Sequence, residues 1–248
     1  MADADAVRML EETTFACWPD LGHERLDGWL LRFAAGHTKR ANSVNVLHGD
    51  EQGLERRIEE AERRYCGAGL RPVFRLTPLA ESRLDAALAE RGYGLVEPSL
   101  VKTAAMDQVA AVDPAVVLAE GPDDSWLDGY AAASGLEAAT RDALRAMLER
   151  IDGRPVYAMS SDEEGPLGFA MAVTHRGRVG FFDVLTLPRA RRRGVARRIM
   201  QSLIAWSREE AGARSMWIQV VEANAPARAL YRSMGFATFY AYHYRVAP

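Results

Sequence analysis

An arginine-rich corner between a strand and a helix constrains this chain of 248 residues more than any other segment. A β-like apolar run ends at Leu187, a helical pattern begins at Ala196, and six arginines lie within Arg189–Arg198. The first amides of a helix have no intrahelical partner, and the helix dipole adds positive charge there. Gly194 lets a ligand approach the backbone closely. The corner therefore predicts an anion site suited to a pyrophosphate.

Two familiar phosphate-binding loops are absent from this corner. Its glycine spacing does not match G-x-x-x-x-G-K-[ST], and G-x-G-x-x-G does not occur there. The alternative interpretation is a solvated basic helix start that contacts RNA. A formal net charge of −3 and a pI near 6.0 argue against nucleic acid, and against an anionic membrane surface, as partners.

The composition is that of a globular protein, with 48% hydrophobic and 26% charged residues. Two cysteines, Cys17 and Cys66, are too few for a disulfide framework, and no Cys/His spacing predicts a metal site. No uncharged apolar run reaches the roughly 18 residues of a membrane helix. The acidic N-terminus also lacks the apolar segment of a signal peptide. We expect a cytoplasmic protein.

Apolar periodicity and turn residues predict alternating strands and helices. The predicted strands are residues 28–33, 40–47, 72–76, 93–103, 116–119, 155–160, 167–174, 179–187, 215–221 and 237–246. The predicted helices are residues 54–65, 78–91, 123–134, 136–151, 196–212 and 226–234. A linker rich in Ala and Asp, residues 106–114, divides the chain into domains 1–108 and 115–248.

The two domains share an order of elements near their ends. In each, a charged amphipathic helix precedes a strand, a proline-started helix, a Gly-aromatic pair and a last strand. The Gly-aromatic pairs are Gly92-Tyr93 and Gly235-Phe236. We interpret this as an internal repeat of about 100 residues. The alternative is that the two domains independently share an order that is common in α/β proteins.

A second motif follows the corner after one helix and one strand. It runs from Asn224 to Phe236. Residue by residue it fits an ordinary capped helix, with Asn224 as N-cap, Leu230 in the core and Gly235 as the C-terminal stop. That interpretation does not explain why both segments occur in one chain at this separation.

The two motifs together resemble the signatures of the GNAT acetyltransferases. Arg191-x-x-Gly194-x-Ala196, preceded by Thr186-x-Pro188, resembles the family's R/Q-x-x-G-x-G/A pyrophosphate signature. The second acyl-CoA signature resembles Asn224-x-x-Ala227-x-x-Leu230-Tyr231-x-x-x-Gly235-Phe236. The resemblance covers residues 115–248. The first domain keeps only the end of the pattern and resembles the degenerate N-terminal half of two-domain GNAT proteins.

The resemblance implies an α+β fold with a mixed, splayed sheet flanked by helices, built from two GNAT-like halves. Acetyl-CoA would lie where residues 179–187 and 215–221 separate, its pantetheine pairing with the backbone of Val184, Leu185 and Thr186. Asn224 would bond near the pantetheine. The pyrophosphate would be held at the corner by Arg191, Arg192, Arg193, Gly194, Val195, Ala196 and Arg197.

The implied activity is acetyl-CoA-dependent N-acetyl transfer to a primary amine of a small molecule or peptide, directly in a ternary complex. By motif position, Tyr231 would protonate the leaving thiolate. Some family members carry a Glu base where this chain has Gln219, which cannot accept a proton. Asp183, Glu222 or an ordered water would then serve as base. By strand alternation Asp183 faces opposite Phe182 and Val184, as a base or as the partner of a nearby arginine.

The acceptor side is less constrained by sequence. Arg40, Asn42 and Asn45 belong to a polar strand that either lines a substrate pocket or is simply exposed. The aromatic final strand, which includes His243, is a candidate wall of the acceptor site. Because Gln219 stands where some family members carry a Glu base, a second function remains an alternative: a catalytically inactive sensor that binds acyl-CoA. A homodimer is also left open.

Overall fold

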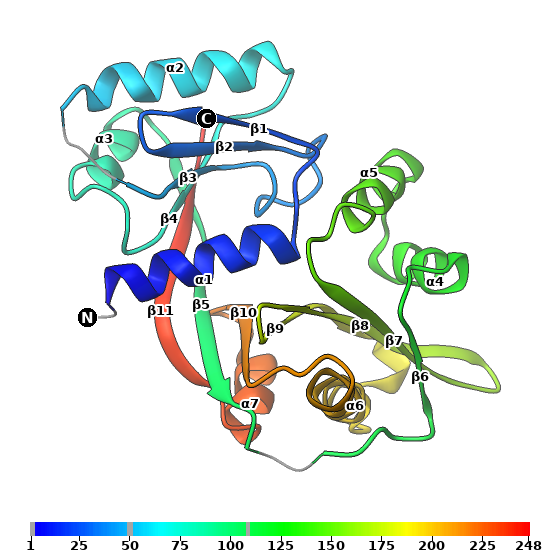
Figure 1. Ribbon diagram of the computed structural model, residues 1–248. Helices are drawn as coiled ribbons and strands as arrows, with labels where there is room; N and C mark the ends of the chain where they lie inside the picture. The colour runs from blue at the N-terminus through cyan, green and yellow to red at the C-terminus, as the bar shows by residue number, and fades with distance from the viewer. Residues whose placement is uncertain (1–2, 49–51, 108–109) are drawn as a thin grey trace.

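One mixed sheet forms the centre of the protein. The computed structural model describes residues 3–48, 52–107 and 110–248. In this part of the chain eleven strands pair in the order β1-β2-β3-β4-β11-β5-β10-β9-β8-β7-β6. Helices cover the sheet (Figure 1). The predicted α+β class with a splayed mixed sheet is confirmed.

The elements have the following bounds. The strands are β1 (Gly22–Leu26), β2 (Trp29–Phe33), β3 (Val44–Val46), β4 (Val73–Leu76), β5 (Gly94–Ala105), β6 (Val116–Ala119), β7 (Arg154–Asp162), β8 (Gly165–His175), β9 (Arg178–Thr186), β10 (Ser215–Val221) and β11 (Ala237–Val246). The helices are α1 (Ala4–Cys17), α2 (Leu54–Gly67), α3 (Leu84–Glu90), α4 (Asp124–Ser134), α5 (Ala138–Leu148), α6 (Val195–Glu209) and α7 (Ala225–Ser233), with a 3₁₀ turn at Pro188–Ala190.

The two halves of the chain exchange their last strands. β3 and β4 are parallel neighbours joined through α2, as β9 and β10 are through α6. The strand that ends the first half, β5, pairs with β10 of the second half. The strand that ends the second half, β11, pairs with β4 of the first. β5 and β11 run side by side through the middle of the molecule (Figure 1). Each half of the sheet is thus completed by the other, and a domain division between residues 108 and 115 stays a prediction.

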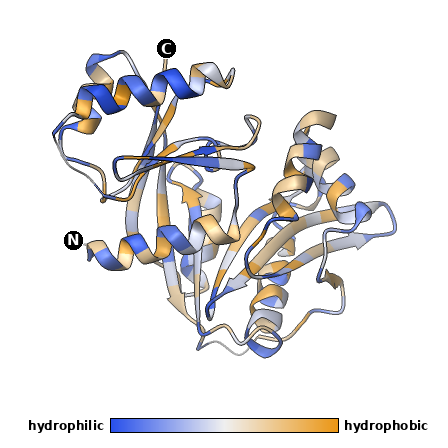
Figure 2. Cartoon of the chain, turned by 45° about the horizontal axis from the view of Figure 1, so that its top comes forward, coloured by the Kyte–Doolittle hydropathy of each residue, from blue (hydrophilic) through white to orange (hydrophobic). Residues whose placement is uncertain are grey.

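Amphipathic helices bury the two faces of the sheet. α6 packs on β7, β8 and β9, whereas α1 and α4 contact β8 from the opposite face. α2 shows the pattern most clearly, because Leu54, Ile58, Ala61 and Tyr65 are buried, whereas its Glu side chains and its arginines are exposed or half-buried. The exception is Arg57, which is buried and pairs with Glu81. Figure 2 shows this mixture of hydrophilic and hydrophobic turns along α2.

Most predicted elements are present, and the exceptions lie in the first half. The strand predicted over residues 40–47 is only β3, because residues 38–42 form turns. The helix predicted from residue 78 begins at Leu84. The sequence reading missed α1 and β1. Among the described residues, no helix combines the length and apolar character needed to cross a membrane.

We predict that Gly180→Ala destabilises the fold. Gly180 pairs with Trp217 across β9 and β10, and a Cβ there would lie 2.3 Å from Cζ2 of the buried indole. Overpacking of this kind costs about 1–3 kcal/mol, which thermal or urea unfolding would measure. Gly22→Ala in β1 is the matched control, because no atom lies within 4 Å of its new Cβ. Equal stability of the two variants would contradict the prediction.

Candidate active site

The parallel strands β9 and β10 separate part-way along their length. Their pairing runs from Arg178–Ser215 to Phe181–Ile218 and ends there, although both strands continue. A β-bulge accompanies the separation, because the β8–β9 register shifts beyond Phe182 and Asp183 has a left-handed φ of 52°. Bulges bend a strand and re-aim its side chains. The bulge therefore opens the predicted gap between the two strands.

The corner after β9 presents uncapped helix amides. Gly194 takes a left-handed φ of 77° at the N-cap of α6 and supplies no capping side chain. The first i to i−4 bond of the helix is from the Arg198 amide to the Gly194 carbonyl, at 3.1 Å. The amides of Val195, Ala196 and Arg197 lie before that bond and have no intrahelical acceptor. This geometry suits an anion.

A groove of about 730 Å³ runs from the corner into the gap. We call it the corner groove. Ten of the eleven residues predicted to bind the cofactor line it, and Arg193 is the exception. Its lining consists of Val184, Leu185, Thr186, Ala190, Arg191, Arg192, Gly194, Val195, Ala196, Arg197, Asn224, Pro226, Ala227, Leu230 and Tyr231.

The arginines of the corner differ in their contacts. Arg189 is fixed to Asp162, 2.9 Å away, and to the carbonyls of Gly165 and Pro166, so it holds the β7–β8 turn. The guanidinium of Arg197 donates to Ser233 Oγ of α7 at 2.6 Å. In contrast, residues 191–193 are exposed. Of these, Arg191 and Arg192 also line the corner groove and are available to a ligand there.

The second motif forms the opposite wall of the corner groove. Asn224 caps α7 by accepting a hydrogen bond from the Ala227 amide at 3.1 Å, as expected of an N-cap. Tyr231 is 5% exposed, and burial raises its pKa to about 12. Its side chain lines the corner groove and also a smaller cavity of about 210 Å³ between the separated strands. We call this smaller space the strand cavity.

Asp183 lies in the strand cavity, and its predicted orientation is wrong. Simple alternation would place it opposite Phe182, but the bulge puts both side chains on the α4 side of the sheet. Burial raises the pKa of Asp183 to about 6, against an opposing effect of Arg40. The nearby Tyr130 hydroxyl of α4 also lowers the pKa of Asp183 by favouring the ionised carboxylate. The arginine near Asp183 therefore comes from the first half of the chain and not from the corner.

Residues of the first half enclose the far end of the strand cavity. A third space of about 270 Å³, the polar cavity, is lined by Thr38, Lys39, Arg40, Glu97, Ser99, Gln219, Val220, Val221, Tyr242 and Tyr244. Arg40, Gln219, Val220 and Val221 line the strand cavity as well. Since the strand cavity also shares Tyr231 with the corner groove, the three spaces adjoin in series.

The other two predicted substrate residues lie behind Arg40. The Asn42 side chain is buried, accepts from the amides of Ala34 and Gly36 and donates to the carbonyls of His37 and Thr38. Asn42 therefore fixes the loop that carries Arg40. Asn45 is buried in β3 and donates to the Ser43 carbonyl at 2.8 Å. The structure brings only Arg40 of the three to the cavities.

The sequence reading missed Tyr130 and Glu97. Tyr130 lies on α4, far from the motifs, and no local pattern marks it. Glu97 precedes Pro98 in a strand and has a left-handed φ of 50° at a bulge in β5. Its carboxylate pairs with Lys39 at 2.8 Å. Of the final strand, Tyr242 and Tyr244 do line the polar cavity, whereas His243 hydrogen-bonds to Asp85. Among the described residues, no cluster of three or more His, Cys, Asp or Glu could hold a metal.

A family model described as the C-terminal part of the probable histone acetyltransferase Rv0428c matches residues 4–245. The chain belongs to this family, within the GNAT superfamily. A relative named uncharacterized N-acetyltransferase YobR, from Bacillus subtilis, is 26% identical over 98% of this chain and 99% of its own length. The probable histone acetyltransferase Rv0428c of Mycobacterium tuberculosis is 34% identical over 54% of this chain and 42% of its own.

Solved GNAT structures share the fold. A GCN5-related N-acetyltransferase from Kribbella flavida superposes with a TM-score of 0.72 and 16% identity, over 100% of this chain and 96% of that one. A tandem GNAT protein from the clavulanic acid biosynthesis pathway superposes with a TM-score of 0.61 and 13% identity, over 97% of this chain and 87% of that one.

We predict that Asp183→Asn stabilises this GNAT fold in a pH-dependent way. The pKa of Asp183 rises from 3.8 to about 6 on folding, so between these values the folded state binds more protons than the unfolded one. The contribution of Asp183 to the free energy of unfolding therefore falls as pH rises through this window. The variant should have the higher Tm at about pH 8, and the gain should vanish near about pH 4.

Thermal unfolding of wild type, Asp183→Asn and the exposed-site control Glu149→Gln across this pH range measures the effect. A difference in Tm between Asp183→Asn and wild type that does not change with pH would contradict it.

Proposed function

We propose that the protein transfers the acetyl group of acetyl-CoA to a primary amine, directly in a ternary complex. The observation that supports this most is the series of adjoining spaces. The corner groove meets the strand cavity at Tyr231, and the strand cavity meets the polar cavity at Arg40. A carrier in the groove and an acceptor in the polar cavity would meet between the separated strands.

The corner groove has the chemistry that acetyl-CoA needs. We assign the diphosphate to the free amides of residues 195–197 and to Arg191 and Arg192, which are exposed and line the groove. Along the gap, β9 has lost β10 as a partner beyond Phe181. We assign the pantetheine amides to this open edge at Val184, Leu185 and Thr186, in the manner of an added strand, and to Asn224.

Asp183 is the candidate base. Its pKa of about 6 leaves it ionised at neutral pH, yet makes it a stronger base than an ordinary carboxylate. It would take the proton that the amine loses as the nitrogen attacks the thioester carbonyl and the C–S bond breaks. Gln219 has no proton-accepting role here, since it is uncharged and its Oε1 accepts from the Tyr242 hydroxyl at 2.9 Å.

Tyr231 is the candidate donor to the leaving sulfur. With its pKa raised to about 12, it remains protonated at neutral pH but is a weaker acid than a free tyrosine. We therefore assign it a hydrogen bond that stabilises the thiolate as it forms, and solvent supplies the final proton. Charge-assisted hydrogen bonds contribute about 1.5–3 kcal/mol.

The names of the relatives do not identify the acceptor. One is a probable histone acetyltransferase, and another, 33% identical over 47% of this chain, is the streptothricin acetyltransferase of Streptomyces lavendulae. A catalytically inactive acyl-CoA sensor is the competing function that Gln219 suggested. It would bind acetyl-CoA and release no thiol with any amine.

We predict that Tyr231→Phe lowers kcat roughly 10- to 100-fold while the Kd for acetyl-CoA changes less than about twofold. Free-thiol release with a panel of amines measures turnover, and calorimetry measures binding. Tyr93→Phe, in the first half, is the matched control. Normal turnover of Tyr231→Phe would disprove the role of Tyr231. Failure of wild type to bind acetyl-CoA at millimolar concentration would disprove the proposed function.

A further inference from the structure

Two opposite charges face the strand cavity without meeting. Arg40 enters from the loop before β3, and Asp183 enters from the bulge in β9. They interact electrostatically. Among the described residues, however, neither side chain comes within ion-pair distance of the other, and neither takes part in another ion pair. A cavity that presents one positive and one negative group in this way is complementary to a zwitterion.

Asp183 has an unused acceptor. Its Oδ2 atom is buried and has no hydrogen-bond partner among the described residues. The nearby Tyr130 hydroxyl favours the ionised carboxylate, yet Oδ2 remains unpaired. Buried polar atoms are almost always paired in folded proteins, so an exception needs an explanation. A substrate ammonium supplies up to three donors and would satisfy this oxygen.

Arg40 is stacked and rigidly placed. Its guanidinium carbon lies 5.3 Å from the centre of the Trp18 ring and 5.7 Å from that of Phe182. Contacts with ring faces hold the guanidinium and leave the N–H donors at its edge for a ligand. That planar fork matches a carboxylate in a bidentate manner.

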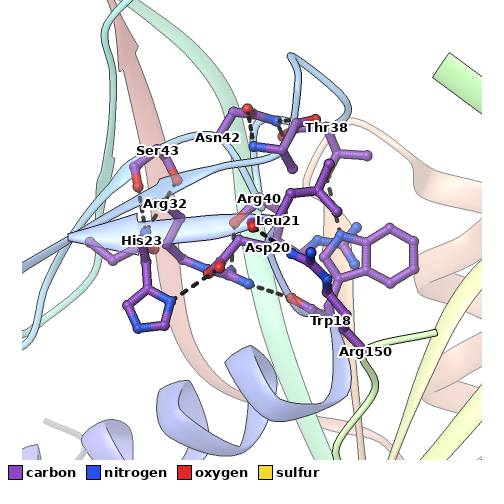
Figure 3. Close-up of polar contacts among 12 residues, drawn as sticks. Trp18, Asp20, Leu21, His23, Arg32, Thr38, Arg40, Asn42, Ser43 and Arg150 are labelled. Carbon is purple, nitrogen blue, oxygen red and sulfur yellow. Dashed lines mark hydrogen bonds and ion pairs between the residues drawn. The ribbon is translucent and has the colours of Figure 1, made fainter. Parts of the chain in front are cut away.

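A fully buried arginine holds the backbone beneath Arg40. Figure 3 shows Arg32 donating to the Arg40 carbonyl at 2.9 Å, to Asp20 at 2.7 Å and to the Trp18 carbonyl. The Trp18 indole N–H in turn donates to the Thr38 hydroxyl at 3.2 Å. Burying a charged guanidinium is costly unless its donors are satisfied. Here the satisfied donors fix both Arg40 and the ring on which it stacks.

The other charges of the polar cavity cancel. Lys39 and Glu97 form an ion pair with each other, and Ser99, Gln219 and Tyr242 are neutral. The cavities are also small beside the ~300–1,000 Å³ of typical ligand pockets. These cavities therefore offer a polycation no cluster of unpaired negative groups.

From these contacts we infer that the acceptor is a small amino acid, or a compound that likewise carries a carboxylate next to its primary amine. The carboxylate binds Arg40 and the ammonium binds Asp183, which places the nitrogen beside the gap between β9 and β10. The inference rests on the proposed function, because it names the acceptor of that reaction. It predicts that peptide N-termini and plain alkylamines are poor acceptors, because they lack the adjacent carboxylate.

The test compares free L-amino acids with their carboxamides as acceptors, by thiol release from acetyl-CoA. For the amino acid that it acetylates fastest, the wild-type protein should use the free acid in preference to the matching carboxamide. Arg40→Gln should lower kcat/KM for that acid roughly 10- to 100-fold and remove the preference, with an unchanged Kd for acetyl-CoA. Arg71→Gln, on the exposed surface of the first half, is the matched control. Circular dichroism and Tm verify that each variant is folded.

Equal use of acids and amides by wild type, or a preference retained in Arg40→Gln, would overturn the inference. Calorimetry of the same amino acids on the protein–CoA complex separates it from the proposed function. Binding that Arg40→Gln abolishes, with no thiol release, would support the acceptor site and contradict the transferase. Thiol release with plain amines only would support the transferase and contradict the acceptor site. Neither binding nor turnover of any amino acid would overturn the inference outright.

Discussion

The site depends on the point at which β9 and β10 stop pairing. Up to Phe181 and Ile218 they form an ordinary parallel ladder, and the buried Trp217 packs against Gly180. Beyond that point the bulge at Asp183 turns β9 away and leaves its backbone without a partner on one side. Backbone amides seek hydrogen bonds, so such an edge favours an extended polar ligand. The same bulge turns Asp183 toward α4 and Arg40, so one local distortion creates both the gap and its charged residue.

The exchange of β5 and β11 explains why the first half of the chain matters to a site whose motifs all lie in the second. β5 pairs with β10, which carries Gln219, and β11 brings Tyr242 and Tyr244 to the polar cavity. Loop 34–42 of the first half then reaches the strand cavity through Arg40. The first half lacks the arginine corner, yet it supplies the wall that an acceptor would contact. In the proposed reaction, the second half would hold the carrier and the first half would contact the acceptor.

Sequence predicted the second half better than the first, for physical reasons. Strong alternation and clear turn residues gave β6, β10 and β11 with their observed bounds, and the corner motifs located the groove. The strand predicted over residues 40–47 was too long because a side chain replaces strand pairing there. The Asn42 side chain hydrogen-bonds to backbone groups of Ala34 and His37 and so fixes a loop. The bulge at Asp183 was not predictable from alternation, which assumes a regular strand. Contacts between the halves, such as Arg40 on the Phe182 ring, depend on the strand exchange, and no local pattern encodes that.

Backbone hydrogen exchange, followed residue by residue with and without saturating acetyl-CoA, tests most directly whether the open edge and the corner hold the carrier. We expect slower exchange at the amides of residues 184–186 and 195–197 in the complex, with β6, remote from the groove, unchanged. Saturation by acetyl-CoA with no protection at either segment would contradict the account, because the ligand would then be bound elsewhere.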